Sequence, residues 1–255
     1  MADGPNQPAL GRLLRDVPRD SYFLTTKIDP SYSDAPAYAT LATNFTPATA
    51  YYRTIEQAAH NLADLEVERV DLLLVHWSSP DCAVMRETWR AMEQVHALGW
   101  ASAIGVSNYC PSTLACILET ARVVPAVNQV KFHAGNGADP GGVKSFCDAR
   151  GIVLQAYSPL GAGTTDHPRT PELITGDLVT RIGEKYGVSG AQVSLRWVVQ
   201  NGVPVAAEST NEEHLAIDLD IFGFELSDVD MATLNAATAP PSAFGGSYSN
   251  KRCNL

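Results

Sequence analysis

The sequence predicts an α/β protein whose parallel strands and helices form a (β/α) barrel. Short, almost continuously apolar runs alternate with longer amphipathic stretches along the 255 residues. Such runs are typical of strands buried on both faces, and strand-then-helix repetition implies parallel pairing through right-handed crossovers. A doubly wound dinucleotide fold would carry G-x-G-x-x-G after its first strand, but Gly161-Ala162-Gly163 comes late and is only a fragment of it. The barrel is therefore favoured over the open sheet.

Six apolar runs are predicted to be strands. They are Tyr22–Ile28, Val70–Trp77, Ala101–Asn108, Ala126–Phe132, Ile152–Pro159 and Val203–Ser209. About six strand-and-helix units follow one another with no linker, charge block or low-complexity tract between them. We therefore predict one domain over residues 1–255.

The stretches between these runs are predicted to be helices. They are Tyr52–Leu65, Arg86–Leu98, Pro111–Thr120, Gly141–Arg150, Pro171–Tyr186, Ser189–Gln200 and Asn211–Leu219. The first of them places Ile55, Ala58, Ala59, Leu62 and Leu65 on one apolar face. Gly99 is a C-cap signal, and a last short helix is predicted to begin after a cap at Ser227.

Composition excludes several classes of function. A net charge of -10 argues against non-specific binding to nucleic acid or to an anionic membrane. No signal-peptide pattern and no apolar run of about 18 residues is visible, so we predict a cytoplasmic protein without a membrane span. The five cysteines are odd in number and form no C-x-x-C, which favours reduced, structural thiols and no metal site. They are Cys82, Cys110, Cys116, Cys147 and Cys253.

Polar residues stand at the carboxyl ends of all six predicted strands, where a parallel barrel carries its active site. They are Lys27, His76-Trp77, Ser107-Asn108, Gln129 with Lys131 and His133, Tyr157-Ser158, and Glu208-Ser209. One histidine at a strand end is usually a structural residue. Polar residues at six consecutive ends predict a single catalytic cavity.

Seven ordered motifs carry a resemblance to a known family. They are Thr25-Thr26-Lys27, Val70–Trp77 (VDLLLVHW), Ile104–Tyr109 (IGVSNY), Val127–Val130 (VNQV), Ala156–Gly161 (AYSPLG), Leu195-Arg196-Trp197 and Leu226–Met231 (LSDVDM). From about Leu10 to Met231, before a tail of residues 232–255, the chain resembles the NADP-dependent aldo-keto reductases. The resemblance implies a (β/α)8 TIM barrel and reversible NAD(P)H-dependent reduction of an aldehyde or ketone.

The resemblance also implies residue roles. Lys27 corresponds to the lysine that pairs with the catalytic tyrosine and lowers the pKa of its phenol. His76 corresponds to the histidine that hydrogen-bonds the substrate carbonyl oxygen. The predicted cofactor-binding residues can be grouped by the part of the nucleotide that each is expected to hold. Ser107, Asn108 and Gln129 would hold the nicotinamide carboxamide, Tyr157 would stack on the ring, and Ser158 and Leu160 would lie along the pyrophosphate.

One departure from the family lies at the amino end. Counting back from Leu10–Leu14 places the family's tyrosine at about Gly4 or earlier and its aspartate before Met1. The resemblance therefore predicts an incomplete barrel that lacks the first two strands, with activity in doubt. The strands left without neighbours at either end would expose backbone groups and favour self-association. Tyr22, Tyr51 and Tyr52 are close in sequence, but we do not expect any of them to replace the missing acid.

A second departure concerns the cofactor. The family reads the 2′-phosphate of NADP with a lysine-serine pair and an arginine, and the corresponding residues here are Glu208, Ser209 and His214. Replacing a lysine by a glutamate reverses a charge beside the phosphate. We therefore expect weakened NADP(H) binding, which makes NAD(H) an alternative cofactor.

Three hypotheses about function follow. The leading one is a truncated oxidoreductase of aldo-keto reductase type that acts on a small carbonyl compound. The alternatives are an incomplete gene model of a normal reductase, and a short form that binds a nucleotide or a partner without catalysis, a pseudoenzyme. The substrate would be set by the loops Asp29–Ala50 and Ser78–Met85 and by the tail Ser242–Leu255, with Trp77 and Phe244 as candidate pocket walls.

Overall fold

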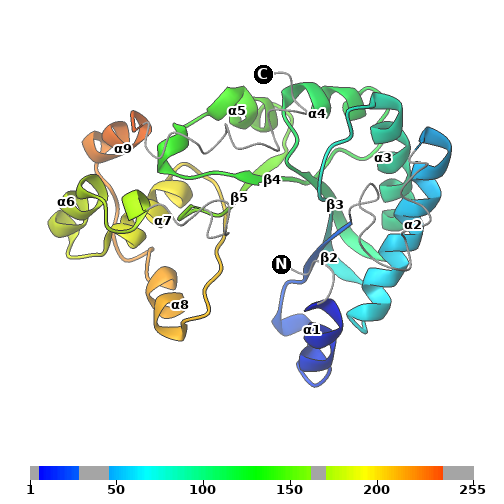
Figure 1. The fold of residues 1–255 in the computed structure, drawn as a ribbon, viewed down its shortest axis with the longest axis horizontal. Coiled ribbons are helices and arrows are strands. Elements are labelled where there is room, and N and C mark those ends of the chain that lie inside the picture. The colour runs from blue at the N-terminus through cyan, green and yellow to red at the C-terminus, as the bar shows by residue number, and fades with distance from the viewer. Residues whose placement is uncertain (1–5, 29–45, 162–170, 238–255) are drawn as a thin grey trace. The chain divides into compact units, whose positions relative to one another are not determined.

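The structure is a computed structural model that describes residues 6–28, 46–161 and 171–237. Its six strands form one sheet in the order in which they occur along the chain (Figure 1). They are β1 (Thr25–Ile28), β2 (Val70–Val75), β3 (Ala101–Ser107), β4 (Val127–Lys131), β5 (Val153–Tyr157) and β6 (Val205–Ala206). The pairs β1–β2, β2–β3 and β5–β6 are parallel. Sequential parallel order is that of a barrel wall, so the predicted α/β fold class is confirmed, with six strands among the described residues.

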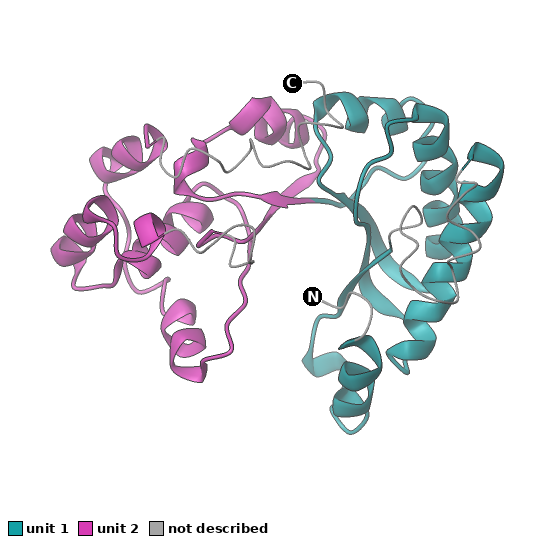
Figure 2. Cartoon of the chain, in the orientation of Figure 1, with its two compact units in different colours: residues 1–128 teal, residues 129–255 magenta. Residues whose placement is uncertain are grey.

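The chain divides into two compact units, residues 1–128 and residues 129–255 (Figure 2). Each unit has its own buried apolar residues and is described by itself below. The prediction of a single domain is not tested by this division and stays a prediction.

The first unit packs helices against β1, β2 and β3. Its helices are α1 (Gln7–Leu14), α2 (Pro47–Asp64), α3 (Cys82–Ala97) and α4 (Pro111–Leu118), with a 3-10 turn at Arg19–Ser21. The apolar run of β2 lies at the centre, where Leu72, Leu73 and Leu74 are each at most 2% exposed. A Cβ added to Gly105 of β3 would lie 2.5 Å from the carbonyl oxygen of Val127, so a side chain there would force the two strands apart.

A buried polar network joins α1, β1 and α2. Gln7 Nε2 donates to Asn61 Oδ1 at 3.3 Å, and Thr26 Oγ1 donates to Gln7 Oε1 at 3.3 Å. Asn61 Nδ2 donates to the backbone oxygen of Lys27 at 2.7 Å. Because buried amides need partners, this network fixes the position of the β1 end at which Lys27 stands.

The buried face of α2 differs from the predicted one. Ala58 and Leu65 are buried as predicted, but Ala59 is exposed and the buried stripe passes instead through Thr54 and Asn61. The physical reason is that the Asn61 amide bonds β1, which turns that side of the helix inward. The prediction considered only apolar residues and therefore left out the polar residues Thr54 and Asn61.

The second unit carries the end of β4, the strands β5 and β6, and five helices. These are α5 (Val143–Asp148), α6 (Asp177–Tyr186), α7 (Gly190–Gln200), α8 (Glu212–Leu219) and α9 (Asp228–Asn235), with 3-10 turns at Ala134–Asn136, Pro140–Gly142 and Pro171–Leu173. The rings of Phe132 and Trp197 stack at 5.1 Å between the strand end and α7. Trp197 Nε1 donates to Asn235 Oδ1 at 2.9 Å, which ties α9 to the same core.

Two predicted elements of this unit are shorter than expected. The stretch Pro171–Tyr186 is divided, because Gly176 is extended at the start of α6 and a Cβ there would lie 2.5 Å from the Glu172 carbonyl oxygen. The predicted strand Val203–Ser209 is reduced to β6, whose two residues pair with Ala156 and Tyr157 of β5. Only residues that lie opposite a partner strand can form the backbone hydrogen bonds of a β-ladder.

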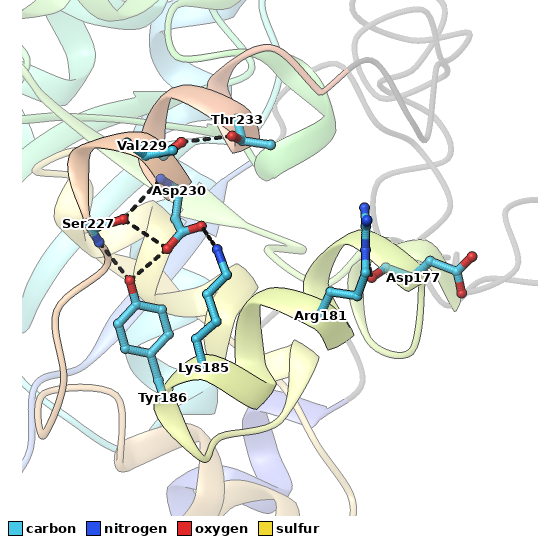
Figure 3. A network of polar contacts seen from close by, with 8 residues as sticks. All are labelled: Asp177, Arg181, Lys185, Tyr186, Ser227, Val229, Asp230 and Thr233. Carbon is cyan, nitrogen blue, oxygen red and sulfur yellow. Dashed lines mark hydrogen bonds and ion pairs between the residues drawn. The ribbon is translucent and has the colours of Figure 1, made fainter.

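Asp230 is the centre of a network that anchors α9 on α6 (Figure 3). Its carboxylate accepts from Lys185 Nζ at 2.5 Å, from Tyr186 Oη at 2.7 Å and from Ser227 Oγ at 2.9 Å. The hydrogen bond from Lys185 holds the pKa of the Asp230 carboxyl below its usual range, against the effect of burial. The predicted cap at Ser227 is confirmed, since its side chain accepts from the Asp230 backbone N–H at 3.2 Å.

The prediction of reduced thiols is wrong for three of the described cysteines, because Cys82, Cys110 and Cys116 are disulfide-bonded. Cys82 and Cys116 form a disulfide with a Cα–Cα distance of 5.9 Å, and it joins the start of α3 to α4. Cys147 is a buried thiol outside the disulfides. A separation of 34 residues gives no sequence signal for pairing. Only the packing of the two helices brings the sulfur atoms within bonding range.

Candidate active site at the strand ends

Lys27 stands near the carboxyl end of β1 and is 5% exposed. Its Nζ donates to Ser107 Oγ of β3 at 3.5 Å, across the intervening strand β2. The register explains this contact, because Lys27 faces Leu74, which in turn faces Gly105, two residues before Ser107. The predicted catalytic lysine and one predicted cofactor residue are therefore in contact.

His76 follows β2 directly and is half-buried. Its backbone N–H donates to the Ile28 carbonyl at 2.7 Å, which extends the β1–β2 ladder by one residue. Its carbonyl oxygen accepts from Asn108 Nδ2 at 3.0 Å. The imidazole stacks on the Trp77 indole with ring centroids 5.0 Å apart, so a planar neighbour orients the ring.

Ser107 and Asn108 end β3 as a buried polar pair. Ser107 is fully buried and accepts from Asn108 Nδ2 at 3.1 Å. Asn108 has a φ of 61°, a left-handed conformation that asparagine tolerates better than most residues. This turn directs the amide back to both His76 and Ser107. Four of the predicted site residues in the first unit thus form one hydrogen-bonded group.

Gln129 and Tyr157 occupy neighbouring strands of the second unit. Gln129 is buried, and its Nε2 donates to Gln155 Oε1 at 2.7 Å. Burial raises the pKa of Tyr157 to about 12, so this phenol stays neutral. Sequence reasoning did not single out Gln155. The signal that could have identified Gln155 is a polar residue inside an otherwise apolar strand, two positions before Tyr157.

Ser158 and Leu160 begin the turn after β5. Ser158 has a φ of 49°, and its carbonyl oxygen accepts from the Gly161 N–H at 3.0 Å. A left-handed residue directly after a strand reverses the chain at the strand end. Residues 162–170, which continue this loop, lie outside the described residues.

The start of α8 lies between the predicted 2′-phosphate residues: Glu208 and Ser209 precede the helix, and His214 lies in its first turn. Glu208 and His214 are exposed, and Ser209 Oγ donates to the Asn211 carbonyl at 3.3 Å. Asn211 caps the helix, since its Oδ1 accepts from the backbone N–H of Glu213 at 2.8 Å. The first turn of α8 also carries Glu212 and Glu213, so this helix start is rich in carboxylates.

The predicted site residues thus fall into four described groups, one in the first unit and three in the second. Two of the tyrosines near the amino end, Tyr22 and Tyr51, pack against arginine side chains. Tyr22 precedes β1 and its ring lies under the Arg19 guanidinium, while the Tyr51 ring of α2 lies under Arg90 of α3. Of the predicted substrate loop Asp29–Ala50, residues 29–45 lie outside the described residues, whereas residues 47–50 form the first turn of α2 and not a loop. Phe244 and the tail Ser242–Leu255 also lie outside the described residues.

Neither a metal-binding cluster nor a membrane-spanning helix is found among the described residues. In residues 6–28, 46–161 and 171–237, no group of three histidine, cysteine or acidic residues is arranged to hold a metal ion. Among the helices of the same residues, none is both long enough and apolar enough to span a membrane.

Known proteins resemble this chain over most of its length. The profile of the Aldo/keto reductase family matches residues 2–239. Morphine 6-dehydrogenase of Pseudomonas putida is 34% identical over 237 residues, which cover 90% of this chain and 74% of that enzyme. An aldo-keto reductase from a Medee basin deep-sea metagenome library superposes with a TM-score of 0.76 at 26% identity, over 91% of this chain and 78% of that one.

A silkworm (Bombyx mori) aldo-keto reductase complexed with NADPH superposes with a TM-score of 0.73 at 26% identity, over 90% of this chain and 69% of that one. The ordered strand-end motifs, the six-stranded parallel sheet and these matches all agree. The chain belongs to the aldo/keto reductase family of NAD(P)-dependent oxidoreductases.

Proposed function

We propose that the chain binds a nicotinamide dinucleotide at its strand ends, favours NAD(H) over NADP(H), and acts on a small aldehyde or ketone. One observation carries the proposal. Lys27, Ser107 and Asn108 are linked by side-chain hydrogen bonds, and the Asn108 amide also donates to the backbone carbonyl of His76, at three consecutive strand ends. A cation, an imidazole, a hydroxyl and an amide gathered in this way suit a polar amide ligand and a carbonyl oxygen.

The residues fit the nicotinamide end of such a cofactor. Ser107 and Asn108 present a hydroxyl and an amide at a buried strand end, which are the groups that recognise a carboxamide. Tyr157 presents a neutral aromatic ring beside Gln129 and Gln155. A bound nicotinamide ring supplies or accepts the hydride. The solved silkworm relative complexed with NADPH supports this class of ligand.

Lys27 and His76 would act on the carbonyl compound. In a buried setting the Lys27 ammonium stabilises negative charge that develops nearby, and the Ser107 hydroxyl fixes its position. His76 would donate a hydrogen bond to the carbonyl oxygen, with its ring held by Trp77. Both residues orient and polarise the substrate, whereas proton delivery requires a further acid.

The residues do not fit the 2′-phosphate of NADP. Glu208 occupies the position expected for a cation, and Glu212 and Glu213 add two carboxylates in the first turn of α8. Two unit charges 4 Å apart interact by about 1 kcal/mol in water and about 4 kcal/mol at an effective dielectric constant of 20. A ribose with a free 2′-hydroxyl meets no such repulsion, which favours NAD(H).

Calorimetric titration of NADH and NADPH tests the proposal. Glu208→Lys should tighten NADPH more than NADH, by about 1–3 kcal/mol, and added salt should reduce this difference. Glu184→Lys is the matched control, because it makes the same charge change at an exposed position of α6. If the wild type binds NADPH more tightly and Glu208→Lys changes nothing, the proposed cofactor preference is wrong. If neither nucleotide binds either protein, the nucleotide site itself is wrong.

A further inference from the structure

Lys131 is a charged residue for which the proposed reaction has no use. It is the last residue of β4 and is half-buried. Side chains alternate along a strand, so Lys131 shares a face with Gln129, whereas the next residue, Phe132, packs on Trp197 of α7. Lys131 therefore lies on the face that carries the predicted carboxamide ligand and not on the face that α7 covers.

The strand register places Lys131 beside Tyr157. The Phe132 N–H donates to the Tyr157 carbonyl at 3.4 Å. In a parallel pair, a donor to residue 157 stands opposite residue 158, so Lys131 stands opposite Tyr157 and Gln129 opposite Gln155. The hydrogen bond of 2.7 Å between the two glutamine side chains agrees with this register. Lys131 and Tyr157 are thus cross-strand neighbours about 5 Å apart.

The charge of Lys131 is not balanced within the described part of the chain. Among those residues it forms no ion pair and no hydrogen bond. Burial lowers the pKa of the Lys131 ammonium below its usual range, as expected for a cation that has lost water without gaining an anion. An ammonium that has lost part of its hydration without gaining an anion can regain favourable interactions by binding one.

His133 supplies a second, independent donor on the same segment. It is 1% exposed, and burial together with the Lys131 charge lowers its pKa to about 3, so the ring is neutral. Its Nδ1 accepts from the Gly135 N–H at 3.3 Å, which assigns the ring proton to Nε2. In the described structure that buried Nε2 has no hydrogen-bond partner. Buried donors without a partner are rare in folded proteins, and a bound acceptor would satisfy this one.

We infer that Lys131, supported by His133, binds an anionic oxygen group of a ligand held on the Gln129–Tyr157 face. The group is either the carboxylate of an oxo-acid substrate or the diphosphate of the dinucleotide. Both offer oxygen acceptors to an ammonium and to an imidazole N–H. The inference rests on the proposed function, because that function places a nucleotide and a carbonyl compound on this face.

Lysine NMR on the whole chain tests the inference without relying on turnover. The chain has only five lysines, so ¹³Cε signals can be assigned with single variants. Inorganic pyrophosphate and glyoxylate, which is an aldehyde with a carboxylate, serve as the two probes. The probe that matches the natural group should raise the pKa of Lys131 and shift its signal saturably, while the Lys144 signal stays unchanged.

Variants decide whether Lys131 is the cause of binding. Lys131→Met should weaken binding of the effective probe at least tenfold, and Lys131→Arg should restore part of it. Lys144→Met is the control, because Lys144 pairs with Asp148 on α5. Equal unfolding temperatures verify that Lys131→Met is folded. The inference is overturned if neither probe moves the Lys131 signal, or if Lys131→Met binds the probe within twofold of wild type.

A parallel NADH titration of the wild type separates this inference from the proposed function. Binding of NADH together with a Lys131 signal that responds to neither pyrophosphate nor glyoxylate would overturn the inference and leave the cofactor proposal standing. A Lys131 response to pyrophosphate or glyoxylate without NADH binding would support the anion site and overturn the cofactor proposal.

Discussion

Removing the Cys82–Cys116 disulfide should cost a large part of the stability of the first unit. The bridge links α3 to α4 and closes a loop with a sequence separation of 34 residues. The chain-entropy relation for a loop of that length gives about 4 kcal/mol of stabilisation, through restriction of the unfolded chain. For a protein of this size each kcal/mol shifts the midpoint of unfolding by about 2–4 °C, so we expect a loss of about 10 °C.

The assay is thermal unfolding of Cys82→Ala, Cys116→Ala and the double variant, followed by circular dichroism. Each single variant already breaks the bond, so the singles and the double should lose similar amounts. Cys147→Ala removes a buried thiol that has no bridge, and it measures the cost of lost packing alone. Additive losses from the two single variants, or a double variant within about 1 kcal/mol of Cys147→Ala, would refute the entropic argument.

Three further predictions follow from the structure. Asp230→Asn should lower the free energy of unfolding in urea by about 1.5–3 kcal/mol. Because the pKa of Asp230 is depressed in the folded state, the stabilisation that its carboxylate provides is present above the unfolded pKa of about 4 and disappears as the pH falls through the folded pKa. The variant should lack this contribution to the pH dependence. Gly105→Ala should cost about 1–3 kcal/mol in the same assay, since its Cβ would meet the Val127 carbonyl at 2.5 Å, and an unchanged midpoint would mean that β3 and β4 can separate freely. The chain should reduce 4-nitrobenzaldehyde about 10²–10⁴-fold more slowly than a relative with a positioned general acid, measured as NADH oxidation, because the described residues gathered at Lys27 include no such acid. Fast turnover abolished by Lys27→Met would show that another acid acts there.

The sequence alone determined the fold class and offered the candidate site residues. Apolar runs gave the six strands because strands buried on both faces must be apolar, and their ends were marked by Lys27, His76, Asn108 and Gln129. The ordered motifs gave the family, which the comparisons confirm. The effect expected of Glu208 on cofactor binding depends on its charge alone, so the sequence was sufficient to predict it.

The tertiary structure decided every feature that depends on contact between distant segments. On α2 it added Thr54 and Asn61 to the buried stripe and left Ala59 exposed, and the Asn61 amide bonds β1. Helix packing brought Cys82 and Cys116 together, which no spacing rule predicted. The unpaired charge of Lys131 became visible only with the register of β4 and β5. Local patterns record which residues prefer burial, whereas hydrogen bonds, disulfides and uncompensated charges depend on which segments meet in space.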